Sequence, residues 1–283
     1  MPSVLLDDRA LITVSGPEAA HFLHNLVTCD IEGLEPGIVA PGALLTPQGK
    51  IMFDFLVSRA GDDAFRLDCL AASAGDFARR LMLYKLRAKV EINVAEQADA
   101  SVSWQTDSPP AGALRDKRFP GIGVWRHYGA PEGKDDLAQW TALRIAHGVA
   151  EAGADYAEGD AFPHDAGLDQ TGGVSFRKGC FVGQEVVSRM QHRGTARRRI
   201  LLVSGEGALP APGTALEAGG KPVGALGSVD GASGLALARI DRVKSAMDAG
   251  TPVSAGGVTV TLSLPSHVAY RFPDTAGDTP DDG

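Results

Sequence analysis

The spacing of apolar residues changes near residues 195–200 of the chain. Before that point, short runs with the period of a strand alternate with longer runs that have the period of a helix. "RALITV" at 9–14 predicts a strand, "SGPEAAHFLHNLV" at 15–27 a helix, and "GALLTPQGKIMFDFLVSR" at 42–59 two strands joined by a turn at 47–49. Afterwards, Gly, Pro, Asp and Ser break up Val, Leu and Ala stretches about every 8–12 residues, as in a small barrel or sandwich. The pattern therefore predicts an α+β part followed by an all-β part.

Two more runs in the first part have the period of a helix. "SAGDFARRLMLYKLRAKV" at 73–90 repeats apolar residues at helical spacing, and "DDLAQWTALRIAHG" at 135–148 begins with acids and ends on a glycine. Two pairs of residues have the spacing of N-terminal helix caps: Ser15 with Glu18, and Ser73 with Asp76. We therefore expect the first two helices to begin at these serines.

Composition and charge narrow the class of protein. The chain has 283 residues, of which 44% are apolar and 22% charged, and these values are ordinary for a globular protein. The net charge of -8 argues against a protein that coats nucleic acid or an anionic membrane. The sequence contains no apolar run long enough to span a bilayer, and "MPSVLLDDRALITV" lacks the features of a signal or transit peptide. We therefore expect a cytoplasmic protein without membrane or direct nucleic-acid partners.

The cysteines and the change in pattern suggest how the chain is organised. The three cysteines at positions 29, 69 and 180 are far apart and form no C-x-x-C pair, which fits a reducing compartment and predicts no metal site. We predict a first domain at 1–198 and a β domain at 199–270. The acidic stretch "RFPDTAGDTPDDG" at 271–283 is expected to be a disordered tail.

The stretch "KGCFVGQEVVSRMQHRG" at 178–194 contains the candidate chemistry. It predicts a turn that leads into a helix from about Val182, with Cys180 just outside the helix N-terminus. Free N–H groups at that end stabilise an anion, and Arg177 and Lys178 add positive charge, so the thiolate is favoured. The alternative is that the cysteine is a small buried hydrophobe. On the helix itself, one face is expected to pack inward and one pair to face across the surface: Val186, Val187 and Met190, and Glu185 with Arg189.

Other polar groups allow two interpretations each. His21 and His24 have the spacing of two metal ligands on a helix, but without a third ligand they are better explained as surface histidines. Asn25 and the nearby Thr28 and Asp30 could line a ligand opening or could only cap and turn the chain. The arginines of "QHRGTARRRI" form a basic loop that could bind carboxylates or only face solvent: Arg193, Arg197, Arg198 and Arg199.

The stretch at 178–194 closely resembles the signature of the YgfZ-type folate-binding proteins, which assist iron–sulfur cluster assembly or repair. That family shares a superfamily with the aminomethyltransferase (T-protein) of the glycine cleavage system. "LITVSGPEAAHFLHNLVTCDI", "ALLTPQGKIMFDFLV" and "LRIAHGVAEAGADYAEGDAFPHDAGLD" are similar to other segments of the superfamily and occur in the expected order. The resemblance implies an α+β fold with interleaved N-terminal α/β subdomains that bind tetrahydrofolate in a central opening, followed by a small β-barrel.

The resemblance also implies which residues have functional roles, and the sequence departs from part of the superfamily. Cys180 would be the reactive thiol with Lys178 beside it, and six residues would contact folate: Asn25, Asp54, Gln184, Glu185, Arg189 and Arg193. Aminomethyltransferases carry two adjacent aspartates where this chain has Phe53 and Asp54, and a glutamate where it has Ala146. Asp54 faces away from Phe53 on a strand and need not replace the lost acid.

Three functions are compatible with the sequence. The first is a tetrahydrofolate-binding accessory protein that supports iron–sulfur clusters in client enzymes through the Cys180 thiolate. One cysteine cannot hold a four-thiolate cluster, so any cluster would be shared with a client or assembly protein. The second is a tetrahydrofolate-dependent aminomethyltransferase, against which Phe53 counts. The third is a folate-binding tRNA-modification factor that uses the arginine loop.

Overall fold

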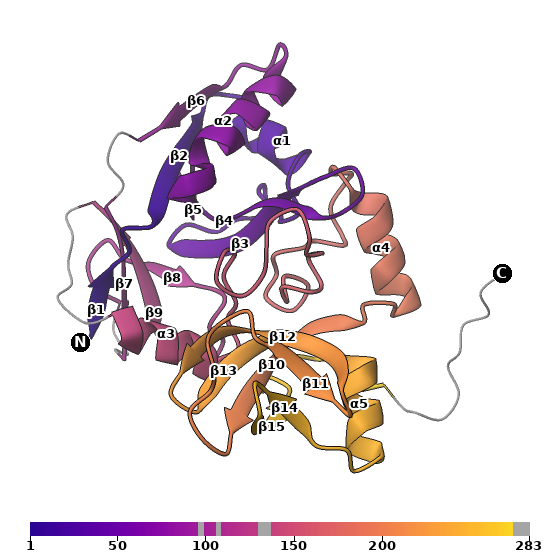
Figure 1. The fold of residues 1–283 in the computed structure, drawn as a ribbon. Helices are drawn as coiled ribbons and strands as arrows, with labels where there is room; N and C mark the ends of the chain where they lie inside the picture. Colours follow the sequence, from indigo (N-terminus) through magenta and orange to yellow (C-terminus); the bar gives the residue numbers. More distant parts are fainter. Residues whose placement is uncertain (96–98, 106–108, 130–136, 274–283) are drawn as a thin grey trace. The chain divides into compact units, whose positions relative to one another are not determined.

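The computed structural model describes residues 1–95, 99–105, 109–129 and 137–273 of the chain. The chain divides into two compact units (Figure 1). The first unit comprises Met1–Trp140, Ala157–Pro163 and Leu168–Arg193. The second comprises Thr141–Tyr156, His164–Gly167 and Gly194–Gly283. Most of the predicted tail, residues 274–283, lies outside the described residues.

The first unit contains a nine-stranded mixed sheet in the order β1-β7-β9-β8-β3-β4-β5-β2-β6. The pairing of β3 with β8 is parallel, and the other neighbouring strands are antiparallel. The strands are β1 (Ser3–Leu5), β2 (Arg9–Ser15), β3 (Ile38–Leu45), β4 (Ile51–Gly61), β5 (Ala64–Leu70), β6 (Glu91–Val94), β7 (Ala100–Trp104), β8 (Leu114–Asp116) and β9 (Val124–Tyr128).

The sheet is curled, because two strands that are not neighbours in it exchange contacts. Three strands separate β9 from β5, yet the Tyr128 hydroxyl of β9 donates to the Asp68 carboxylate of β5 at 3.0 Å. Arg126 of β9 also lies 3.6 Å from Asp68, and the Arg9 guanidinium donates to the same carboxylate at 2.6 Å. Asp68 is fully buried, and although burial alone would raise its pKa, the charges of Arg9 and Arg126 and the hydrogen bonds from Arg9 and Tyr128 hold that pKa below its usual value.

The predicted hairpin at 42–59 is confirmed as β3 and β4. Thr46 and Lys50 close the turn with an N–H to carbonyl bond of 2.8 Å, and Gly49 lies at the turn with a φ of +81°. A positive φ is strained for any residue with a side chain, so glycine suits this position. At the start of β4 burial alternates as predicted: Phe53 packs inward, while the neighbouring Asp54 faces the other side and is half-buried; residues 55–58 are all buried.

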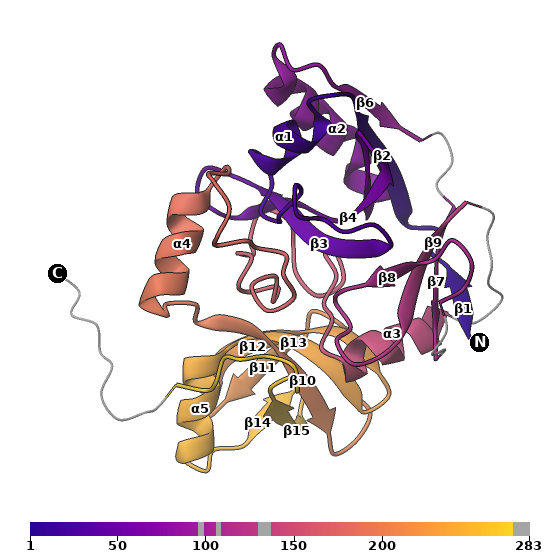
Figure 2. The same cartoon turned by 180° about the vertical axis from the view of Figure 1, so that it is seen from behind.

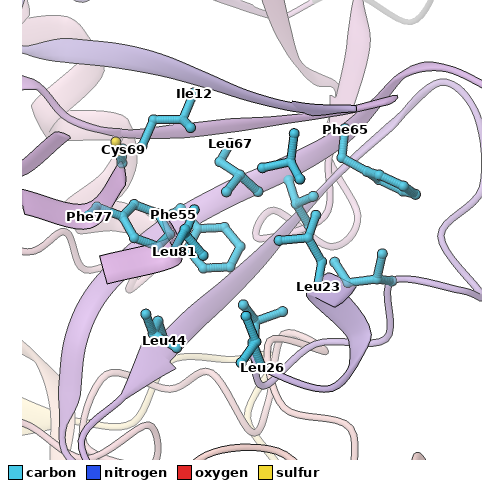
Figure 3. Close-up of a cluster of buried hydrophobic side chains, with 14 of the residues drawn as sticks. Ile12, Leu23, Leu26, Leu44, Phe55, Phe65, Leu67, Cys69, Phe77 and Leu81 are labelled. Carbon is cyan, nitrogen blue, oxygen red and sulfur yellow. The ribbon is translucent and has the colours of Figure 1, made fainter. Parts of the chain in front are cut away.

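Two helices cover part of this sheet and close the core of the unit. α1 (Ala19–His24) contacts β5, and α2 (Ala71–Lys85) contacts β2, β5 and β6, as Figures 1 and 2 show. The ring of Phe77 on α2 stacks on Phe53 at 5.0 Å and on Phe55 at 5.4 Å between ring centroids. Figure 3 shows the apolar cluster around these rings, which includes Ile12, Leu23, Leu26, Leu44, Phe65, Leu67, Cys69 and Leu81.

The predicted starts of both helices were wrong. Ser15 belongs to β2, because its pairing with Ala64 and Glu91 extends the strand ladder through that residue. α1 therefore begins at Ala19, and the Glu18 carboxylate accepts the backbone N–H of Lys89 at 2.8 Å. α2 begins at Ala71, so Ser73 lies inside it and donates to the carbonyl of Leu70. Strand pairing and long-range contacts therefore override the local capping pattern.

The second unit contains a closed barrel of six strands in the order β10-β13-β12-β11-β14-β15. The strands are β10 (Arg198–Gly205), β11 (Ala215–Ala218), β12 (Lys221–Asp230), β13 (Ser233–Arg239), β14 (Val253–Ala255) and β15 (Val258–Ser263), with α5 (Ile240–Asp248) after β13. The end of α3 (Leu137–Ala146) is tied to this barrel by Arg144, whose guanidinium donates to Asp155 and to Ser228 at 3.0 Å each. Of the two folds that the periodicity allowed, the barrel is the one adopted.

Candidate functional site

Cys180 is the exposed cysteine of the chain, whereas Cys29 and Cys69 are buried in the core of the first unit. It lies in an irregular segment that precedes α4 (Gln184–Arg193). The helix starts two residues later than predicted, because Val182 and Gly183 form a turn in which the Gln184 N–H bonds to the Phe181 carbonyl at 3.3 Å. The interpretation of Cys180 as a buried hydrophobe is therefore wrong.

Two glycines let the start of α4 lie against the β3–β4 turn. A side chain at Gly183 would meet the Thr46 carbonyl oxygen at 2.5 Å, and one at Gly49 would meet Val186 at 2.9 Å. Gly183 also has a φ of +78°, which favours glycine. A larger residue at either position would push the helix away from the hairpin. Gly183 is therefore needed for the packing of α4 against the hairpin, in addition to any role of this segment in chemistry.

Lys178 fixes the Cys180 segment to the end of α1. Its half-buried ammonium donates to the backbone carbonyls of His24 and Val27 and lies 5.1 Å from the centroid of the Phe181 ring. A cation is favourable at a helix C-terminus, where carbonyl groups lack partners within the helix. Burial lowers the pKa of Lys178, and the negative charges of Asp30 and Glu32 oppose that change. Its contacts make this lysine an anchor of the segment.

Thr28 provides a second attachment for the same segment. The Thr28 hydroxyl donates to the carbonyl of Gly173 at 2.6 Å, and the N–H of Ser175 donates to the Thr28 carbonyl at 2.9 Å. Thr28 is fully buried and also pairs with Ala43 of β3 through its backbone and side chain. Of the two interpretations open for Thr28, the structure supports the structural one. The exposed thiol is therefore carried by a segment held at two points.

The exposed surface of α4 carries the predicted pair of Glu185 and Arg189, whose charged groups are 2.8 Å apart. The inward face is less buried than expected: Val187 is fully buried, whereas Val186 and Met190 are half-buried. Gln184 begins the helix and is half-buried. Arg193 ends it and is exposed.

Asp54 lies beside a carboxyl group that the sequence analysis missed. Glu158 accepts a hydrogen bond from the backbone N–H of Asp54 and lies within hydrogen-bonding reach of Ser73. Burial, followed by the charge of Asp54, raises the pKa of Glu158 to about 7. Backbone bonds of 2.7–2.8 Å between Ile51 and the segment 157–163 hold Glu158 in this position. No sequence pattern indicates this pair, because long-range backbone contacts create it.

Asn25 and the two histidines of α1 form a local polar group. The Asn25 amide donates to the His21 carbonyl at 2.9 Å and lies 3.0 Å from His21 Nε2. His24 Nδ1 lies 3.4 Å from Asp30, and His21 Nδ1 lies 3.7 Å from Glu32. In the described ranges, no three His, Cys, Asp or Glu side chains are grouped closely enough to hold a metal ion. His21 is a surface residue as interpreted, whereas the His24 side chain is only 13% exposed.

The structure brings together only some of the residues with predicted roles. Asn25 follows His24, whose carbonyl binds Lys178, so it lies next to the attachment of the Cys180 segment. Four of the residues predicted to contact folate lie on one helix, α4: Gln184, Glu185, Arg189 and Arg193. Asp54 contacts Glu158.

The basic loop does not form one continuous patch. Within the second unit, Arg198 pairs with Asp165 at 2.7 Å, and the buried Arg199 donates to the His164 carbonyl at 2.8 Å. Arg193 and Arg197 are the two arginines of the loop that are exposed. Arg198 and Arg199, at the end of the arginine-rich stretch, therefore have structural contacts within the second unit.

The curled sheet and the closed barrel define the class of protein. Residues 8–105 match the family model described as GCVT N-terminal domain, and residues 197–270 match CAF17, C-terminal beta-barrel domain. The crystal structure of the glycine cleavage system aminomethyltransferase T from Bartonella henselae superposes with a TM-score of 0.75 at 18% identity, over 96% of this chain and 87% of that one. The fold is thus that of the aminomethyltransferase superfamily.

Sequence relatives identify the family within that superfamily. The iron-sulfur cluster assembly factor IBA57, mitochondrial, is 30% identical in Mus musculus, over 92% of this chain and 83% of the relative. The Homo sapiens protein of that name is 32% identical, over 84% and 78%. A homologue from Chaetomium globosum is 31% identical over 69% of this chain, and the match spans about half (54%) of that longer protein. The chain belongs to the IBA57/CAF17/YgfZ family of iron–sulfur cluster assembly factors. No helix among the described residues is long and apolar enough to cross a membrane.

Proposed function

We propose that this protein supports the assembly or repair of iron–sulfur clusters in client enzymes, with the Cys180 thiolate as its contact group and tetrahydrofolate as its bound cofactor. The main observation in favour is the placement of Cys180, which is exposed on a segment that Lys178 and Thr28 anchor. A thiol that reaches solvent from an anchored segment can meet a partner at a defined position. The family membership supports the same role.

The other two cysteines are unsuited to this chemistry. Burial raises the pKa of Cys29 to about 12, and it raises the pKa of Cys69 to about 12. Both therefore remain neutral thiols at physiological pH, and the thiolate is the form that attacks electrophiles and binds metal. The proposal consequently rests on a single thiol.

A single thiol limits what the protein can do with a cluster. Clusters are normally held by four cysteine thiolates. We therefore infer that Cys180 contributes one ligand, or one sulfur contact, to a cluster that an assembly protein, a client or a small thiol also holds. The cluster is cargo in this scheme, and the partners are iron–sulfur assembly or client proteins. We retain a cytoplasmic location as a prediction.

The residues of the first unit fit a folate in part. Folate has N–H donors on its pterin and carboxylates on its tail, so it needs acceptors at one end and cations at the other. We propose Asp54, with Glu158 beside it, as acceptors for the pterin, and the exposed Arg193 as a cation for the tail. Asn25, Gln184, Glu185 and Arg189 are proposed as further polar contacts. Bound folate would supply a one-carbon carrier.

The first test of the proposal is replacement of Cys180 by serine. Because the residue is exposed, the free energy of unfolding should change by less than about 0.5 kcal/mol. The variant should nevertheless fail to restore iron–sulfur enzyme activities in a deletion strain that the wild type complements. Iodoacetamide should modify Cys180 in the native protein and reach the other two cysteines only after unfolding. Full complementation by Cys180→Ser would contradict the proposal.

The second test concerns the cofactor. Titration calorimetry should detect tetrahydrofolate binding in the micromolar range, and a concentration of about 100 times the dissociation constant should stabilise the protein by about 2.7 kcal/mol. Asp54→Asn and Arg193→Met should weaken binding, whereas Arg87→Met, an exposed arginine beyond the end of α2, should not. Neither heat nor thermal protection with reduced folates would exclude folate as a ligand while leaving the role of Cys180 open.

A further inference from the structure

An exposed apolar surface lies at the C-terminal end of α2, apart from the Cys180 segment. Met82 is 52% exposed, Leu83 64% and Leu86 89%. Met82 and Leu83 lie in the last turn of α2, which ends at Lys85, and Leu86 follows directly after the helix. Isolated exposed apolar residues are common, but a group of three at one helix end marks a candidate contact surface.

Leu86 is also held in an unfavourable backbone conformation. Its φ is 45° and its ψ is −103°, and the Ala88 N–H bonds to the Lys85 carbonyl at 2.7 Å. These values place Leu86 at the second position of a type II′-like turn, where glycine is strongly preferred. A large apolar side chain here costs stability through strain and gains none through burial. Retaining strain of this kind is typical of functional positions.

All of the charged residues in the sequence segment 77–90 are cations. Between Asp76 and Glu91 the chain has five cations and no acid: Arg79, Arg80, Lys85, Arg87 and Lys89. This contrasts with the net charge of -8 for the whole chain. Arg79 is neutralised by Asp76 at 2.9 Å, so the excess positive charge lies mainly around Leu86, where Arg87 and Lys89 are exposed.

A hollow adjoins the same turn. It has a volume of about 630 Å³, and its lining includes Ser15, Lys85, Lys89 and Glu91. Leu86 and Arg87 belong to the turn that borders this hollow. The exposed Leu86 side chain therefore lies next to a hollow lined in part by lysines, and a partner can contact both features.

We propose that the Leu86 surface, defined as Met82, Leu83, Leu86 and the cations Lys85, Arg87 and Lys89, docks a protein whose contact surface is apolar at its centre and acidic at its rim. The sign of the local charge specifies the acidic rim, and the projecting leucine specifies the apolar centre. This inference does not depend on the role of Cys180.

The same features disfavour two other occupants. The Glu18 and Glu91 carboxylates lie among the cations, so the surface has a fixed pattern of both signs; a protein can place its acidic groups opposite the cations alone, whereas the uniformly negative surface of an anionic bilayer cannot. A second copy would have to offer a different, acidic face to this basic one. Such a contact is heterologous and tends to produce open chains of molecules. An acidic protein partner is therefore the occupant that the charges and shape favour.

The test places a photoreactive residue at the centre of the surface. Leu86→p-benzoylphenylalanine, expressed in the native host, should cross-link on irradiation to a protein through a peptide rich in Asp and Glu. Met247 on α5, which is 42% exposed, provides the matched control position. Cross-links to a second copy, no protein cross-links above the Met247 control, or binding to vesicles of phosphatidylglycerol and phosphatidylcholine would each overturn the proposal.

Two variants then separate docking from folding once the cross-linked protein has been purified. Leu86→Gly suits the type II′-like turn, so its thermal midpoint should be at least that of the wild type, yet its affinity for the partner should fall about tenfold. Arg87→Glu should also weaken binding and reduce its dependence on salt. Unchanged affinity in Leu86→Gly, or loss of its stability, would refute the proposed role of this leucine.

Discussion

Replacing Glu158 with glutamine tests whether the Asp54–Glu158 pair sets part of the pH dependence of stability. The pKa of Glu158 is raised from 4.5 to about 7 in the folded protein, mainly because burial disfavours its charged form. The folded state therefore holds this proton more tightly than the unfolded state does. Consequently the Glu158 contribution to the free energy of unfolding falls as the pH rises from about 4.5 to about 7, and it changes little outside that window.

The size of this effect follows from the difference between the two pKa values. A rise from 4.5 to about 7 corresponds to about 3 kcal/mol at about 1.4 kcal/mol per pKa unit. Glu158 is only half-buried, so water screens part of the penalty, and we expect about 1–2 kcal/mol. Glutamine cannot ionise and should therefore make the protein more stable than the wild type above about pH 7, by this amount.

The assay is urea unfolding of both proteins at several values between about pH 5 and pH 8.5. Comparing the two proteins cancels the contributions of the other titrating groups, provided that they are unchanged. Glu206→Gln, which alters an exposed carboxyl group in the second unit, is the matched control and should leave the pH profile unchanged. Asp54→Asn should also reduce the pH dependence, because it removes the neighbouring charge. If wild type and Glu158→Gln differ equally at both ends of the pH range, the reasoning is wrong.

Two more substitutions test the site by other means. Lys178→Met removes the ammonium from the carbonyls of His24 and Val27 and should lower the free energy of unfolding by about 1–3 kcal/mol in urea, whereas Arg177→Met next to it should have little effect. Phe53→Asp places a carboxylate against the Phe77 ring and should destabilise the protein by about 3 kcal/mol or more without giving aminomethyltransferase turnover, measured as ammonia release; turnover would instead support an enzyme.

β2, the β3–β4 hairpin and the short strands of the second unit were predictable because their signals are local, whereas the other strands of the first unit were not predicted. The β3–β4 hairpin follows from apolar runs that flank a turn at Gly49, and the all-β character of the second unit follows from short apolar stretches at regular intervals, which do not distinguish a barrel from a sandwich. Helix starts were less predictable, because pairing with β5 and β6 extends β2 through Ser15. Ser15 and Ser73, which the sequence suggests as helix caps, therefore have other positions: Ser15 in β2 and Ser73 inside α2.

The features of the candidate site were predictable only where they depend on residues close together in the sequence. The exposure of Cys180 is consistent with its glycine-rich, cationic neighbourhood, and the Glu185–Arg189 pair follows from helical spacing. The role of Lys178 as an anchor and the approach of Glu158 to Asp54 depend on backbone contacts across more than 100 residues. No single-sequence pattern contains that information.

The anchoring of the Cys180 segment has a consequence for the order in which the protein matures during synthesis. The bonds from Lys178 to the end of α1 join residues 154 and 151 positions apart, and the Thr28–Gly173 bond joins residues 145 apart. His24, Val27 and Thr28 leave the ribosome long before the segment that bonds to them. Contacts of such separation form late, after the loop between them has closed. Cys180 therefore acquires its fixed position only after the chain has been made past Lys178, so a shorter chain cannot hold this thiol in place.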